Sequence, residues 1–213
     1  MNSYYKNTLY PLQDKALKVI ETSKTPFYLT GGTALSRCYF HFRYSEDLDF
    51  FVNNDSKFPN YIQEIVKVLS KFNLETKIKT DTYCSIFIEN KLKIDFINDV
   101  ASRYGKIVKQ KLFSQVDNPE NILSNKISAL ISRDEPKDVV DIWIIATNKK
   151  IDWKEIFLST RSKAVGIFPP LVAEKLETFP IGLLERINWV EGKKPKKEVF
   201  VKDIQKIISE ILQ

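Results

Sequence analysis

The 213-residue chain has few of the residues that build nitrogen or sulfur metal sites, with one histidine and two cysteines. The cysteines, Cys38 and Cys84, are expected to be reduced thiols rather than a disulfide. No apolar run approaches the roughly 18 residues that a membrane span needs. Residues 1–10 show no signal-peptide pattern. We therefore expect a cytoplasmic protein whose metal, if it binds one, has oxygen ligands.

Glycine is also scarce, with six residues, yet two of them are adjacent, Gly31 and Gly32. Residues 27–30 are typical of a short strand, and residues 33–42, free of Gly and Pro, predict a helix. At such a turn the missing side chains let backbone N–H groups approach a phosphate, and the helix N-terminus adds partial positive charge. Thr33 and Ser36 could add hydroxyl donors. The turn therefore predicts a phosphate site.

Two aspartates, Asp47 and Asp49, open an apolar segment a short way downstream. In a strand they project from one face, while Leu48, Phe50 and Val52 project from the other toward a core. At roughly 4 Å and an effective dielectric near 20, two carboxylates repel by on the order of 4 kcal/mol, so a cation must offset them. Oxygen ligands with room for water and phosphates favour Mg²⁺ over Zn²⁺.

A third carboxylate, Asp95, lies in the alternating segment 91–97. If this strand pairs beside that of Asp47 and Asp49, the three carboxylates converge. Such a trio could hold two metal ions, one on a triphosphate and one lowering the pKa of an attacking hydroxyl, with Asp95 as proton acceptor. The plainer interpretation is that Asp47 and Asp49 are strand-end residues on a wet face.

Charged residues also interrupt two apolar helices predicted at 121–132 and 137–147. Lys126 lies within the apolar stripe of the first helix, with Arg133 along the same edge. Asp138 and Asp141 lie on one side of the second, and carboxylates on a largely buried helix need partners. Three interpretations stay open: snorkelling lysine and arginine stems, a structural ion-pair network, or cations that meet the triphosphate and are oriented by the two aspartates.

The order of the predicted elements indicates an α+β half followed by a helical half. Helices are predicted at 12–20 and 61–72, and the strands at 74–79, 83–88 and 92–97 form an antiparallel section. With the strands near 27 and 48 they make a five-stranded mixed sheet. After Asp99 the strand pattern stops, and helices follow up to an amphipathic one at 199–212. We predict a nucleotide-handling core at 1–115 and a helical domain at 116–213.

At this point the chain resembles the AbiEii-type nucleotidyltransferases. The resemblance rests on residues 31–36 (GGTALS), 43–51 (RYSEDLDFF), 126–130 (KISAL), Arg133 and 137–141 (KDVVD). It spans about residues 27–147, and none is found beyond Asn148. The family has the polymerase-β-like nucleotidyltransferase fold and includes the toxin halves of bacterial toxin–antitoxin pairs.

The resemblance implies that Gly31, Thr33, Asp47 and Asp49 serve the nucleotide and metal, and that Lys126 and Asp141 belong to two later family motifs. Catalysis is assigned to Asp47, Asp49, Asp95, Lys126 and Asp141. Nucleotide binding is assigned to Gly31, Gly32, Thr33, Ser36, Arg43, Lys126, Arg133 and Asp138. Asp47, Asp49 and Asp95 are the predicted metal ligands.

The formal net charge of +6 suits an anionic partner. Lysines cluster at 106, 109 and 111 and at 193, 194, 196 and 197, although such runs are often only a solvated surface. We expect a Mg²⁺-dependent enzyme that transfers an NMP from an NTP to a hydroxyl of RNA or tRNA, as a toxin with a cognate antitoxin. The alternatives are transfer to a small molecule such as an aminoglycoside, or a non-catalytic nucleotide-binding interaction protein.

Overall fold

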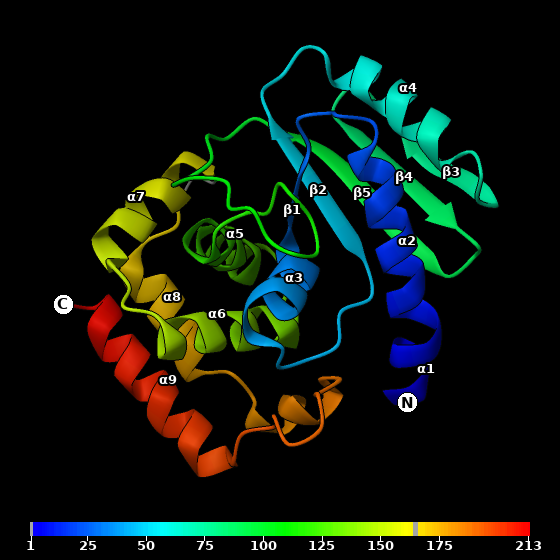
Figure 1. Cartoon of the computed structure of the whole chain (residues 1–213). Coiled ribbons are helices and arrows are strands. Elements are labelled where there is room, and N and C mark those ends of the chain that lie inside the picture. The colour runs from blue at the N-terminus through cyan, green and yellow to red at the C-terminus, as the bar shows by residue number, and fades with distance from the viewer. Residues whose placement is uncertain (1, 164–165) are drawn as a thin grey trace. The chain divides into compact units, whose positions relative to one another are not determined.

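The computed structural model describes residues 2–163 and 166–213, which form two compact units (Figure 1). The first unit comprises Met1–Ala101 and Lys106–Asp117, and the second comprises Ser102–Gly105 and Asn118–Gln213. Across these described residues, no helix combines the length and apolar character that crossing a membrane would take.

The first unit is built on a five-stranded sheet with the strand order β1-β2-β5-β4-β3. The strands are β1 (Tyr28–Thr30), β2 (Leu48–Asn53), β3 (Leu74–Lys79), β4 (Tyr83–Ile88) and β5 (Leu92–Asp99). The central pair β2 and β5 is parallel, and the other neighbours are antiparallel. The predicted mixed sheet and its antiparallel section are confirmed.

One face of this sheet carries the core of the unit. Leu48 and Phe50 on β2 and Phe96 on β5 are fully buried, and the rings of Phe50 and Phe96 stack with centroids 5.2 Å apart. Phe27 contacts both Phe96 and Phe58, the first residue of helix α4 (Phe58–Leu69). This arrangement sends every second side chain of β2 into the core and leaves the alternate ones for the opposite face.

The helices of the first unit begin with a run near the N-terminus. They are α1 (Asn2–Tyr4), the π-helix η1 (Tyr5–Leu9), α2 (Tyr10–Glu21), α3 (Gly31–Ala34), the π-helix η2 (Leu35–Phe40) and α4 (Phe58–Leu69). The helix after β1 was predicted from residue 33, and it begins two residues earlier, at the glycine pair itself. The predicted helices at 12–20 and 61–72 are present as α2 and α4.

Residues 106–117 belong to the first unit and contact the end of β1, a pairing that the sequence pattern did not indicate. The Leu29 N–H donates to the Gln115 carbonyl over 2.8 Å, and the Asp117 N–H donates to the Leu29 carbonyl over 2.9 Å. The Thr30 hydroxyl donates to the buried Asp117 carboxylate over 2.7 Å. These bonds hold the end of β1, and so the glycine turn that follows it.

The second unit is helical. Its elements are α5 (Pro119–Ser132), α6 (Pro136–Asn148), α7 (Trp153–Lys163), α8 (Pro169–Glu177), the 3₁₀ helix η3 (Ile181–Arg186) and α9 (Lys197–Ile211). Proline opens α5, α6 and α8, where its missing N–H costs no helical bond. The predicted helices at 121–132, 137–147 and 199–212 are confirmed. Trp143 of α6 donates to Asp203 of α9 over 2.9 Å, which joins two of these helices.

Candidate active site

Gly31 lies where β1 ends and α3 begins, and any side chain there would be strained. Its φ of +69° lies in the left-handed region that side-chain-bearing residues avoid. A β-carbon at this position would lie 2.3 Å from Asp49 Oδ2. The bare turn therefore lets the Asp49 carboxylate lie directly against the backbone at the start of the helix.

Gly32 makes a similar space for Arg43. A β-carbon on Gly32 would lie 2.3 Å from Arg43 Nη2 and 3.1 Å from Ser45 Oγ. Arg43 is almost entirely buried and donates from Nη1 to the Tyr44 carbonyl over 3.1 Å. The structure thus brings a guanidinium and a carboxylate against the two glycines that the sequence singled out.

The hydroxyls of Thr33 and Ser36 hold the loop between η2 and β2. Thr33 Oγ1 donates to the Asp47 carbonyl over 2.5 Å, and Ser36 Oγ donates to the Arg43 carbonyl. Both residues are buried. They therefore fix the backbone that presents Asp47, and their predicted contact with a phosphate stays a prediction.

The same loop is braced from the N-terminal helices. Gln13, fully buried on α2, donates from Nε2 to the carbonyls of Ser45 and Glu46 over 3.2 and 2.9 Å. Tyr5 donates to Glu46 over 2.5 Å, and its ring stacks on Tyr44 with centroids 4.4 Å apart. Burial, followed by the bond to Glu46, raises the pKa of Tyr5, so it remains a hydroxyl donor at neutral pH.

Asp47 and Asp49 lie on the less buried face of the sheet, as predicted. Along β2 the buried residues alternate with half-buried ones, and Asp49 is half-buried, as is Asp47 just before the strand. Residues two positions apart on a strand point to the same face, so both carboxylates lie on the same side of the sheet.

Asp95 is the register partner of Asp49 on the parallel strand β5. Its carboxylate accepts hydrogen bonds from Tyr83 over 3.1 Å and Ser85 over 2.7 Å, and Lys93 Nζ lies 2.5 Å from Oδ2. Burial acts to lower the pKa of Lys93, but Asp95, Tyr83 and Asp47 together raise it. Lys93 is therefore a cation held among the site's carboxylates, and it stays charged at neutral pH.

A magnesium ion fits the donor chemistry of Asp47 and Asp49, because it prefers carboxylate oxygens and keeps positions for water and phosphate. Within residues 2–163 and 166–213, no group of three or more His, Cys, Asp and Glu side chains is arranged to hold a metal ion. The oxygens of Asp95 are occupied by Lys93, Ser85 and Tyr83. Asp47 and Asp49 are thus the better-fitting ligand pair, and Asp95 as a third ligand stays a prediction.

The charged residues of the helical unit form a compact ion-pair cluster. Lys126 Nζ lies 2.8 Å from Asp138 Oδ1 and 2.7 Å from Asp141 Oδ2, and Arg133 Nε lies 2.8 Å from Asp138 Oδ2. The two aspartates are fully buried and Lys126 is 7% exposed. Burial raises the pKa of Asp138, but Lys126 and Arg133 outweigh it and lower the pKa. The contacts are those of the ion-pair interpretation, and a role toward a triphosphate stays a prediction.

Sequence reasoning missed two residues of the sheet site, Gln13 and Lys93. Gln13 occupies an apolar stripe of α2 with Ala16, Leu17 and Ile20, and a polar residue in such a stripe indicates a buried partner. Lys93 is two residues from Asp95, so strand alternation alone places both on one face.

The fold is that of nucleotidyltransferases, as comparison with solved structures shows. The toxin MenT4 of Mycobacterium tuberculosis H37Rv, a nucleotidyltransferase, has a similar structure, with a TM-score of 0.68 at 14% identity, covering 96% of this chain and 83% of that one. The structure of ANT(2")-Ia in complex with adenylyl-2"-tobramycin has a TM-score of 0.57 at 12% identity, covering 73% of this chain and 97% of that one.

Sequence comparison gives the family. An uncharacterized protein of Aquifex aeolicus, aq_aa25, is 26% identical over 180 residues, which are 83% of this chain and 84% of that protein. The family described as nucleotidyl transferase AbiEii toxin of type IV toxin–antitoxin systems matches residues 16–198. The chain belongs to this AbiEii family and is a nucleotidyltransferase with an NTP as substrate. The match continues past Asn148, so the prediction that the resemblance ends there is wrong.

Proposed function

We propose that the chain transfers an NMP from an NTP to a hydroxyl of RNA, with tRNA as the favoured acceptor, in a Mg²⁺-dependent reaction. The observation that carries the proposal is the placement of Asp47 and Asp49 on one half-buried face, with Asp49 against the Gly31 turn. Two carboxylates beside a bare strand-to-helix turn suit a metal-bound triphosphate.

In this proposal Asp47 and Asp49 hold Mg²⁺, and the backbone at Gly31 and Gly32 lies against the triphosphate. When bound, the ion neutralises charge on the phosphates and promotes loss of the hydroxyl proton. The acceptor oxygen attacks the α-phosphorus, the bond to the β-phosphate oxygen breaks, and pyrophosphate leaves. Asp95 is the proposed proton acceptor, with Lys93 balancing its charge.

An RNA acceptor is supported by charge. The formal net charge is +6, and Lys106, Lys109 and Lys111 are exposed on the loop that returns to the sheet unit. A polyanion is attracted to such a surface at long range, whereas a cationic aminoglycoside is repelled. Membership of the AbiEii toxin family supports a role as the toxin of a toxin–antitoxin pair, restrained by a cognate antitoxin.

The proposal is tested by incubating the chain and Mg²⁺ with each of the α-labelled NTPs in turn, together with total RNA. Label on RNA, with a preference for one NTP and dependence on Mg²⁺, is the expected result. Label on a small hydroxylated compound but not on RNA would show that the acceptor is a small molecule and not RNA. NTP binding without any labelled product would favour a non-catalytic binding protein.

A further inference from the structure

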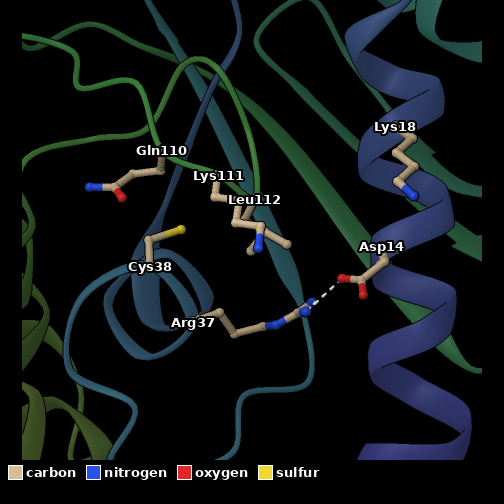
Figure 2. Close-up of a pocket in the computed structure, with 7 residues that line it drawn as sticks. All are labelled: Asp14, Lys18, Arg37, Cys38, Gln110, Lys111 and Leu112. Atoms are coloured by element: carbon tan, nitrogen blue, oxygen red, sulfur yellow. Dashed lines mark hydrogen bonds and ion pairs between the residues drawn. The ribbon is translucent and has the colours of Figure 1, made fainter.

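The first unit has a pocket that the proposed reaction does not use (Figure 2). Its volume is about 380 Å³, within the range of small-ligand sites. Helix α2 contributes Asp14 and Lys18, η2 contributes Arg37 and Cys38, and the loop after β5 contributes Lys111. All these elements belong to the sheet unit.

The lining carries three cations and one carboxylate. Arg37 Nη2 lies 2.5 Å from Asp14 Oδ1, so these two charges largely offset each other. Lys18 and Lys111 are both exposed, and neither is in an ion pair with another of the residues that the structure describes. Figure 2 shows them on different elements around one hollow. Two ammonium groups brought to the same hollow attract an anion.

The remaining polar groups of the pocket do not oppose an anion. Burial raises the pKa of Cys38 to about 11, so its sulfur keeps its proton at neutral pH and adds no negative charge. The Arg37 guanidinium stays fixed, because it lies 4.3 Å from the centre of the Tyr10 ring and donates to Gln13 Oε1 over 2.9 Å. Because this guanidinium is already paired with Asp14, the net positive charge that attracts a phosphate comes from Lys18 and Lys111, and Arg37 forms a fixed wall of the pocket.

We propose that Lys18, Arg37 and Lys111 form a phosphate-binding pocket for the acceptor RNA strand, which rests on the proposed function above. A strand is favoured over a lone phosphate because Lys106 and Lys109 are exposed on the same loop as Lys111, and a run of cations matches a run of phosphates. The chemistry recognised in either case is a phosphate oxygen.

The pocket is joined to the catalytic loop through one buried side chain. Gln13 accepts from Arg37 and donates to the carbonyls of Ser45 and Glu46, directly before Asp47. A strand phosphate bound at Arg37 therefore lies one side chain away from the loop that presents Asp47, within a single unit. The pocket would then position the acceptor relative to that loop.

The test compares the double variant Lys18→Gln/Lys111→Gln with the control Lys67→Gln/Lys71→Gln, which removes two exposed lysines of the same unit outside the pocket. Binding of a fluorescein-labelled single-stranded RNA is measured without NTP across a range of salt. The pocket variant should bind roughly tenfold more weakly near 0.1 M salt, with a log–log slope reduced by about 1.4, since each lost contact removes about 0.7. The control should change much less.

If the two double variants bind RNA equally well and with equal salt dependence, the proposed phosphate-binding pocket is wrong. Loss of inorganic pyrophosphate binding with RNA binding intact would assign the pocket to a free phosphate and overturn its role toward the strand. Because RNA binding is measured without NTP, the result is separate from the labelling experiment. If the parent chain labels no RNA but the Lys18→Gln/Lys111→Gln variant still binds RNA more weakly than the control, the proposed function is contradicted and the proposed pocket is supported.

Discussion

The two units place the same kinds of charged residue in opposite environments. In the sheet unit, Asp47 and Asp49 are half-buried. In the helical unit, Asp138 and Asp141 are fully buried and both contact Lys126. The two buried carboxylates are satisfied by Lys126 and by the exposed Arg133, while a half-buried carboxylate pair can exchange its partners for a metal and a phosphate. The comparison predicts that the carboxylates of the first unit serve catalysis and that those of the second unit serve stability.

The largest expected effect is the loss of nucleotidyl transfer in the variant Asp49→Asn. The amide keeps the shape of the side chain beside Gly31 but loses the charge that would hold Mg²⁺, so transfer should fall by about a thousandfold or more, with thermal stability retained. Asp81→Asn, which changes an exposed aspartate of the same unit, serves as the control. The readout is incorporation of label from an α-labelled NTP. Equal incorporation in the two variants would remove Asp49 from the metal site.

The second largest effect is a loss of stability in the variant Lys126→Ala. The change leaves two buried carboxylates without Lys126, so the free energy of unfolding should fall by about 3 to 5 kcal/mol. The exposed pair of Lys149 and Glu120, 2.9 Å apart, is the matched control, and Lys149→Ala should cost under about 1 kcal/mol. Denaturant titration measures both. A stable Lys126→Ala that has lost NTP binding would instead favour the predicted triphosphate role.

A smaller effect is expected from Gln13→Ala. Two loop carbonyls lose their donor, which should cost about 1 to 3 kcal/mol of stability and lower the transfer rate by roughly tenfold as Asp47 loses its fixed position. Gln63→Ala on the exposed side of α4 is the control. A positioning role predicts a lower kcat with an NTP KM close to that of the parent chain. An unchanged kcat would show that the brace serves folding alone.

The smallest effect is the pH dependence that Asp138 adds. Because its pKa is lowered from 3.8 in the folded chain, its contribution to stability is fully present above that value and is lost as the pH falls through the lowered pKa. Asp138→Asn should therefore flatten the loss of stability on acidification below about pH 4, by at most about 1.4 kcal/mol per pH unit. Chemical unfolding at several pH values measures it. If stability falls with pH in the same way in the parent chain and in Asp138→Asn, the ion pairs of Asp138 do not contribute to stability as proposed.

The sequence predicted those parts of the sheet site that depend on local pattern. Alternation along β2 was enough to separate Asp47 and Asp49 from Leu48 and Phe50, because one face of the strand is buried. The parallel pairing that sets Asp49 beside Asp95 was stated only as a condition, since the two strands are joined by a helix and two further strands.

Longer-range contacts were beyond pattern reasoning. Tyr5 and Gln13 reach the loop before Asp47 from more than 30 residues away in the chain. Val116 pairs with Leu29 and with Val108 through isolated bridges, which are too short to give strand alternation. The ion pairs of Lys126 were among three interpretations that the sequence left open, because a buried carboxylate on the next helix demands a nearby cation but does not exclude a triphosphate role for it.

The most direct test of the central claim follows the two ends of the triphosphate. The chain is incubated with RNA, Mg²⁺ and its preferred NTP, labelled in parallel at the α- or the γ-phosphate. The account predicts that α-label appears on RNA, that γ-label leaves as pyrophosphate, and that Asp49→Asn abolishes both. Transfer of γ-label to the acceptor, or undiminished α-labelling by Asp49→Asn, would contradict nucleotidyl transfer at the half-buried carboxylates of the sheet.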